Sequence, residues 1–175
     1  MKKEIKKQGT EAVYDGKTLS VKYEGKELKR EFHNPFIEIN LEDESITVNS
    51  KKDNKKLKML INTWVSHIKN MIKGVKESYE YKLRICSSHF PISVKVSGNT
   101  FEISNFIGEK VPRKAKIMPG SEVSVEGDLI SVKSQDVESA GQTAGNIECA
   151  TRIIDRDRRR FQDGIYIIKK PRWTE

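Results

Sequence analysis

The sequence contains two copies of one pattern, separated by about 82 to 84 residues. Residues 16–32 read GKTLSVKYEGKELKREF and residues 98–114 read GNTFEISNFIGEKVPRK, each with Gly-x-Thr followed by alternating apolar positions. A second pair of blocks, LEDESITVNSKKD at 41–53 and VEGDLISVKSQD at 125–136, keeps the same order. Agreement over separated blocks indicates a duplicated folding unit. The chain is therefore expected to fold as two similar units.

Each copy has the pattern of strands followed by one helix. In the first copy, Leu19 and Val21 alternate with polar residues, as in a half-buried strand. A helix is predicted to follow, with Asp53 as its N-cap and Gly74 at its end. Trp64 lies in the middle of its apolar stripe and is expected in a core. The stripe consists of Leu57, Leu60, Ile61, Trp64, Ile68, Met71 and Ile72.

The second copy has the same order of elements and predicts a helix at about 136–152. One apolar helix stripe needs one apolar sheet face to cover it. The sequence therefore predicts an α+β fold of two tandem similar domains that arose by internal duplication. Each domain, 1–78 and 79–175, is expected to be an antiparallel sheet packed by one helix.

Gly141 and Gly145 interrupt the predicted second helix. A glycine costs about 1 kcal/mol in a helix interior, so each one calls for a reason. One reason is close packing of the helix on its own sheet. The other is close approach of a ligand backbone, because hydroxyl and amide side chains lie on the same helix and suit phosphates and sugars. The polar residues available for such contacts are Gln142, Thr143, Asn146 and Arg152.

The charge balance makes a polyanion the first partner to consider. The chain of 175 residues has 33 Lys+Arg against 25 Asp+Glu, a net charge of +8 and a pI near 9.4. No apolar run approaches the roughly 18 residues that span a bilayer, and the first residues lack the apolar stretch of a signal peptide. Cys86 and Cys149 are far apart, which favours reduced thiols over a disulfide.

The titratable residues do not form a catalytic or metal-binding pattern. His33, His67 and His89 are scattered, and no pair has metal-ligand spacing. Asp155 and Asp157 are flanked by arginines, which would repel a cation. A phosphate-binding P-loop is absent from the sequence as well. We therefore expect no metal, no cofactor and no enzymatic activity.

Basic residues are concentrated in four segments. These are KKDNKK (51–56), GEKVPRKAK (108–116), RDRRR (156–160) and KKPR (169–172). A single charged run is usually a solvated face. Four such runs without matching acidic runs favour a phosphate-binding surface.

Several blocks resemble one known family. HIKNMIKGV (67–75), SHFPISV (88–94), NFIGEKVPRKAKIMPG (105–120), GQTAGNIECATRI (141–153) and DRDRRRFQDGIYI (155–167) are similar to the large-subunit ribosomal protein six family, in its archaeal and eukaryotic branch. The resemblance covers nearly the whole chain, and the blocks occur in the family's order.

The resemblance implies a structural, non-enzymatic constituent of the large ribosomal subunit. It implies a position near the base of the stalk, beside the sarcin–ricin region where translation GTPases dock, with rRNA and neighbouring large-subunit proteins as partners and no membrane. The expected location is the cytoplasmic ribosome, with a nucleolar stage of assembly in a eukaryote. The alternative is a free-standing or ribosome-associated RNA-binding protein of the same duplicated fold.

In the family, the second domain and the C-terminal extension carry most rRNA contacts. With the basic loop of the second copy, the expected rRNA-binding residues are Lys110, Arg113, Lys114, Gln142, Thr143, Asn146, Arg152, Arg156, Arg158, Arg159, Arg160, Lys169, Lys170 and Arg172. In DRDRRRFQDGIYI, aspartates can hold neighbouring guanidinium groups while free arginines meet phosphates. Phe161 either stacks on a base or fills the sheet, and Asp163–Gly164 is predicted to form a turn before the last strand.

Overall fold

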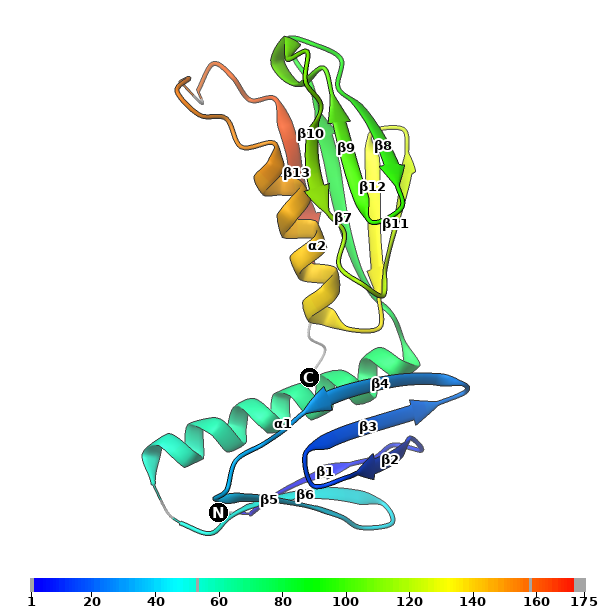
Figure 1. The fold of residues 1–175 in the computed structure, drawn as a ribbon, viewed down its shortest axis with the longest axis vertical. Helices are drawn as coiled ribbons and strands as arrows, with labels where there is room; N and C mark the ends of the chain where they lie inside the picture. The colour runs from blue at the N-terminus through cyan, green and yellow to red at the C-terminus, as the bar shows by residue number, and fades with distance from the viewer. Residues whose placement is uncertain (1, 53, 158, 172–175) are drawn as a thin grey trace. The chain divides into compact units, whose positions relative to one another are not determined.

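The chain divides into two compact units, Met1–Ser78 and Tyr79–Glu175, in a computed structural model (Figure 1). The structure describes residues 2–52, 54–157 and 159–171. Each unit contains antiparallel strands and one α-helix, so the predicted α+β fold is confirmed. In the described part of the chain, neither helix is long and apolar enough to cross a membrane.

Unit 1 consists of two small sheets and a helix. One sheet has the strand order β1-β6-β5 and the other has the order β2-β3-β4, and all neighbours are antiparallel. The helix α1 contacts strands of both sheets. The elements are β1 (Lys2–Lys6), β2 (Glu11–Tyr14), β3 (Thr18–Tyr23), β4 (Lys26–Glu31), β5 (Ile37–Leu41), β6 (Ser45–Ser50) and α1 (Lys55–Lys76).

Unit 2 repeats this arrangement and adds one strand. Its sheets have the orders β11-β12-β7-β13 and β10-β9-β8. The added strand, β13, pairs with the edge of β7 that β12 leaves open. The elements are β7 (Tyr79–Cys86), β8 (Ser93–Ser97), β9 (Thr100–Ser104), η1 (Phe106–Gly108), β10 (Arg113–Lys116), β11 (Ser121–Glu126), β12 (Leu129–Ser134), α2 (Val137–Ala150) and β13 (Gly164–Lys169).

Strand register confirms the duplication. In unit 1, Ile39 of β5 pairs with Val48 of β6. In unit 2, Val123 of β11 pairs with Val132 of β12, and both residues lie 84 positions later. The β2–β3 and β8–β9 pairs also correspond, since their registers agree at an offset of 82 residues. The two offsets inferred from the sequence are therefore the offsets of equivalent strand pairs.

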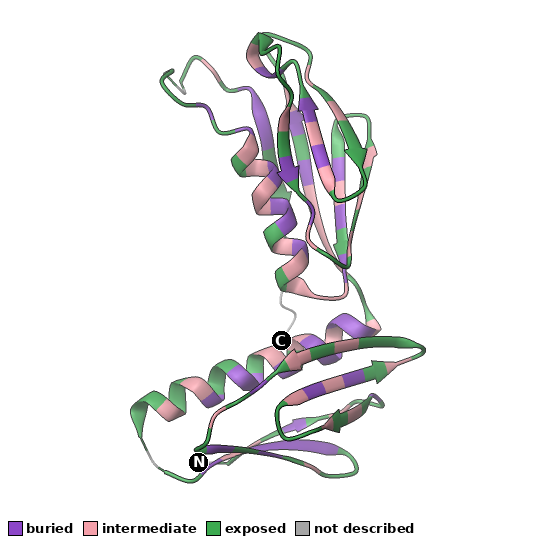
Figure 2. Cartoon of the chain, in the orientation of Figure 1, coloured by how far each residue is buried: buried purple, intermediate pink, exposed green. Residues whose placement is uncertain are grey.

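The alternating apolar residues form a separate core in each unit. Leu19 and Val21 of β3 are fully buried beneath α1, together with Ile46 and Val48 of β6. Figure 2 shows the same alternation as buried positions along the strands and on one side of each helix. Trp64 belongs to the core of unit 1, as its place in the apolar stripe predicts.

Both predicted ends of the first helix are wrong by a short distance. Asn54 is the N-cap of α1, and its Oδ1 accepts a hydrogen bond from the amide of Lys56 at 3.3 Å. Asp53, the predicted cap, lies outside the described residues. The helix continues past Gly74 to Lys76, because Val75 is fully buried and extends the apolar stripe.

Candidate nucleic-acid interface

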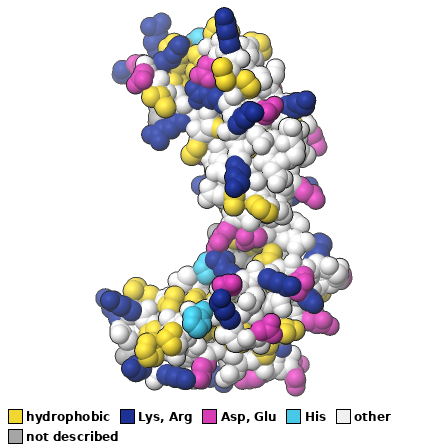
Figure 3. All heavy atoms as spheres, viewed as in Figure 1, with side chains coloured by type: hydrophobic (Ala, Val, Ile, Leu, Met, Phe, Trp, Pro, Cys, Tyr) yellow, Lys and Arg dark blue, Asp and Glu magenta, His cyan; other side chains and the backbone are white. Residues whose placement is uncertain are grey.

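The predicted rRNA-binding residues all belong to unit 2 and come from three places. Those within the described residues lie on α2, on the start of β10 and the residues just before it, and on the segment of residues 151–163 between α2 and β13 with the strand that follows and its last neighbour, Lys170. We call residues 151–163 the arginine loop. Lysine and arginine side chains gather at the end of unit 2 that carries this loop (Figure 3).

Arg113 is occupied by contacts within unit 2. Its Nε and Nη2 donate to both carboxylate oxygens of Glu109 at 2.8 and 2.6 Å. Its Nη1 donates to the carbonyl oxygens of Ala150 at 2.9 Å and Arg152 at 3.1 Å, and its guanidinium lies 4.4 Å from the ring centre of Phe106. The side-chain hydrogen bond from Arg113 lowers the pKa of Glu109. Arg113 therefore joins the segment before β10 to the arginine loop.

The polar residues of α2 mostly serve the fold. Thr143 is 0% exposed, and its Oγ1 accepts a hydrogen bond from the amide of Met118 at 3.0 Å. Asn146 donates to the carbonyl of Lys116 at 2.8 Å and accepts from Gln142, also at 2.8 Å. Gln142 is exposed. Thr143 and Asn146 thus attach α2 to the end of β10, and Thr143 has no surface to offer a ligand.

Among the described residues of the predicted set, the exposed arginines are in the arginine loop. Arg159 donates from Nε and Nη2 to the carboxylate of Asp157, at 3.1 and 3.0 Å. This hydrogen bonding lowers the pKa of Asp157. Arg156 lies over the ring of Phe161, 4.9 Å from its centre. Arg152 and Arg160 are also exposed and form no ion pair within the described part of the chain, and Arg158 lies outside the described residues.

Two residues outside the predicted rRNA-binding set, Asp163 and His89, hold this loop against the segment after β7. Asp163 is 1% exposed, and its Oδ1 accepts hydrogen bonds from the amides of Ser88 and His89. Its Oδ2 accepts from Nδ1 of His89 at 2.5 Å. The His89 ring stacks on Phe161 at 4.9 Å. Asp163 thereby fixes the segment after β7 and, through His89, one side of Phe161.

The predicted turn at Asp163–Gly164 is wrong. Gly164 is the first residue of β13 and pairs with Cys86, while Asp163 faces inward to bind Ser88 and His89. A buried carboxylate needs several donors, and the segment after β7 supplies them. The chain therefore enters β13 directly from a buried anchor.

The lysines at the end of β13 do not gather with the arginines. Lys169 ends the strand and Lys170 follows it, and both are exposed. At about 3.3 Å per residue, a strand of this length separates its ends by roughly 17 Å. Lys110 and Lys114 lie on either side of Arg113 in the sequence. Lys114 forms an ion pair with Glu102 at 3.4 Å. Arg172 lies outside the described residues.

The described residues do not suggest a metal site: no cluster of three or more His, Cys, Asp or Glu side chains occurs among them.

A family model described as "Ribosomal protein L6" matches residues 8–78 and 90–164, one stretch in each unit. The chain belongs to the ribosomal protein L6 family. The "Large ribosomal subunit protein uL6" of Methanococcus vannielii is 47% identical over 171 residues, which are 97% of this chain and 94% of that protein. The uL6 proteins of Aeropyrum pernix and Ignicoccus hospitalis are 46% and 47% identical, each over 93% of this chain and 90% of the relative.

These relatives place the chain in the archaeal branch of the L6 family, as the resemblance implied. The family consists of structural, non-enzymatic proteins, so the chain is not an enzyme.

The structure also shows the surroundings of the two glycines of α2. A Cβ on Gly141 would lie 3.0 Å from the hydroxyl of Tyr81 on β7, which supports close packing on its own sheet. A Cβ on Gly145 would meet no atom within 4 Å.

Replacing Gly145 with alanine should raise the free energy of unfolding of unit 2 by about 0.5–1 kcal/mol. Alanine favours the helix by roughly this amount over glycine, and space for the methyl group is open. Urea unfolding followed by circular dichroism measures the change. Gly141→Ala is the control and should gain less, because Tyr81 must move. Lower stability of Gly145→Ala than of the parent would show that position 145 has no room for a methyl group.

The hydrogen bonds of Asp163 should make the stability of unit 2 depend on pH. Burial raises the pKa of Asp163, but the bonds from Ser88 and His89 outweigh it, and the pKa is lower than in the unfolded chain. A carboxyl group with a lowered folded pKa stabilises the fold above its unfolded pKa, and loses this effect as pH falls through the folded value. Stability should therefore decline from about pH 4 downward.

Asp163→Asn tests this dependence. At pH 7 it should cost about 1–3 kcal/mol, since the substitution removes a buried charge that hydrogen bonds stabilise and replaces one acceptor oxygen with an NH2 donor. Urea unfolding at pH 7 and pH 3 should show the difference from the parent shrinking at the lower pH. Asp157→Asn, in an exposed pair, should change the unfolding midpoint little. A constant difference at both pH values would show that Asp163 is not the titrating group.

Proposed function

We propose that this protein is a structural component of the large ribosomal subunit in the cytoplasm, bound to large-subunit rRNA and to neighbouring ribosomal proteins. The observation that carries the proposal is similarity to proteins named large ribosomal subunit protein uL6 over as much as 97% of the chain. The net charge of +8 supports it, because rRNA is a polyanion.

The arginine loop is the part of unit 2 that we propose as the main rRNA contact. Guanidinium groups bind phosphate oxygens through two parallel hydrogen bonds, and they are most effective when their backbone is held in place. Thr151 and Glu148 provide this support, since they accept hydrogen bonds from the amides of Ile165 and Ile167 at 3.0 and 3.1 Å. Arg152, Arg156 and Arg160 are exposed on the loop so held.

The remaining exposed residues of the predicted set have secondary places in the proposal. Lys110 and Lys114 lie near Arg113, which contacts the arginine loop, and Gln142 lies on α2, whereas Lys169 and Lys170 would reach a separate part of the rRNA. A position beside the sarcin–ricin region at the stalk base, next to docking translation GTPases, completes the proposal and follows from the family resemblance.

Co-sedimentation tests the proposed function. Large subunits depleted of their own L6 protein should take up the full chain and retain it through a high-salt wash. Retention is expected because an integral component has both rRNA and protein contacts. Release by the wash, with binding to free RNA preserved, would favour the alternative of a free-standing RNA-binding protein.

A further inference from the structure

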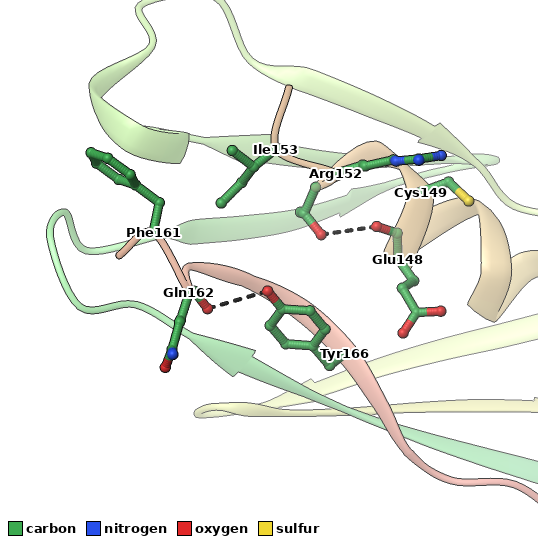
Figure 4. A pocket seen from close by; sticks show the side chains of 8 residues that line it. Glu148, Cys149, Arg152, Ile153, Phe161, Gln162 and Tyr166 are labelled. Atoms are coloured by element: carbon green, nitrogen blue, oxygen red, sulfur yellow. Dashed lines mark hydrogen bonds between the residues drawn. The ribbon is translucent and has the colours of Figure 1, made fainter. Parts of the chain in front are cut away.

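A cavity lies between the C-terminal end of α2 and the start of β13 (Figure 4). Its volume is about 320 Å³, at the lower end of the range for small-molecule sites. Ile153 and the rings of Phe161 and Tyr166 supply apolar surface, while Arg152, Gln162 and Glu148 supply polar groups. We call this cavity the α2–β13 pocket.

The tyrosine of this pocket is held in place without a ligand. The hydroxyl of Tyr166 lies within hydrogen-bonding distance of the carbonyl oxygens of Gln162 (3.2 Å) and Asp163 (3.4 Å). Its ring lies against Gly164, where a Cβ would approach Cζ and Oη to 3.1 Å, so any side chain at this position would displace it. Tyr166 is nevertheless 43% exposed. A fixed and exposed aromatic ring is a surface on which a planar group can stack.

The charges of the pocket indicate how a nucleotide would be oriented. Arg152 lines the pocket with an exposed guanidinium that has no ion-pair partner within the described ranges. Glu148 lines it as well, and its Oε1 accepts from the amide of Ile167 at 3.1 Å, which fixes the carboxylate. A carboxylate repels phosphate and accepts hydrogen bonds from N–H groups. The base of a nucleotide therefore fits inside, and its phosphate fits outside on the arginines.

We propose that the α2–β13 pocket binds one unpaired nucleobase of the rRNA, stacked on Tyr166, with the adjoining phosphate on Arg152. This inference rests on the proposed function and adds a single-nucleotide site to it. Proteins commonly recognise RNA through unstacked bases held by aromatic rings and arginine. An apolar side chain of a neighbouring protein suits the site less well, because it would offer Arg152 no hydrogen-bond acceptor.

The test uses the full chain and large-subunit rRNA transcribed in vitro. Tyr166→Ala should weaken rRNA binding by roughly 5- to 150-fold, the usual effect of losing one base–aromatic stack. Tyr166→Phe keeps the ring and should retain most of the affinity. The matched control is Phe36→Ala, which removes an exposed aromatic of unit 1 and should leave the affinity unchanged. Circular dichroism of each variant checks that it is folded.

A second measurement uses the parent chain, so it does not depend on whether the Tyr166 variants fold. Cys149 is exposed and lines the pocket, whereas Cys86 lies on β7 and is partly buried. Bound rRNA should slow alkylation of Cys149 by N-ethylmaleimide. If Tyr166→Ala is unfolded, protection of Cys149 in the parent decides between a filled and an empty pocket.

The outcomes separate the pocket from the proposed function. Failure of the parent chain to bind rRNA at all would overturn the proposed function and the pocket with it. Normal rRNA binding by Tyr166→Ala, with no protection of Cys149 in the parent, would overturn the pocket alone. A Tyr166→Ala variant that binds naked rRNA normally but fails to enter large subunits would assign the pocket to a protein side chain and also overturn the proposal.

Discussion

Replacing Trp64 with alanine should lower the free energy of unfolding of unit 1 by about 3–5 kcal/mol. Trp64 is only 7% exposed and packs edge-to-face on Phe32, with ring centres 5.2 Å apart. Ile61 and Ile68, one turn away on either side, are fully buried in the same core. The substitution therefore leaves a large cavity where the helix meets both sheets. Urea unfolding followed by far-UV circular dichroism measures the loss, because this signal does not depend on the fluorescence of Trp64.

Met59→Ala is the control for this prediction. Met59 lies on the same helix but is 56% exposed, so its truncation should change stability by no more than about 0.5 kcal/mol. If Trp64→Ala kept the parent's unfolding midpoint but bound rRNA poorly, Trp64 would be a nucleic-acid contact rather than a core residue.

Replacing Arg156, Arg159 and Arg160 together with alanine should weaken rRNA binding and flatten its salt dependence. Each phosphate contact releases counterions, so the slope of log affinity against log salt should fall by roughly two to three units. The fold should persist, because these side chains are exposed and surface ion pairs such as Arg159–Asp157 contribute little. Filter binding at several KCl concentrations gives the slope.

A triple lysine variant of unit 1 provides a matched control. Lys52, Lys55 and Lys56 are exposed near the start of α1, and their replacement by alanine should change the slope less. A larger loss of affinity in the lysine variant would move the main rRNA contact to unit 1 and contradict the assignment to the arginine loop.

Much of the fold could be predicted from periodicity and repetition. Alternation placed Leu19 and Val21 on a buried strand face, and the 3.6-residue stripe placed Trp64 in the core. Alternation assigns faces but not partners, so the division of each unit into two sheets could not be predicted. The position of β13 beside β7 depends on pairs such as Ile165 with Ile85, which local sequence does not encode.

The candidate site was less accessible to sequence reasoning, because composition does not distinguish free charges from paired ones. One signal was present: Thr143 lies three residues after Ala140, on the buried stripe of the helix. In contrast, His89 and Asp163 are 74 residues apart, and only the folded chain brings them together.

The strand that unit 2 has and unit 1 lacks affects more than the sheet to which it belongs. Because β13 is paired along β7, the arginine loop is tied at both ends: at Thr151 to Ile165 of β13 and at Asp163 to the segment after β7. A free chain end samples many conformations and must lose them on binding. A loop restrained at both ends has lost most of them already when the unit folds. Most of the conformational entropy of the loop backbone is thus lost when unit 2 folds. Less of it remains to be lost when RNA binds, so affinity for RNA is higher than for a free chain end.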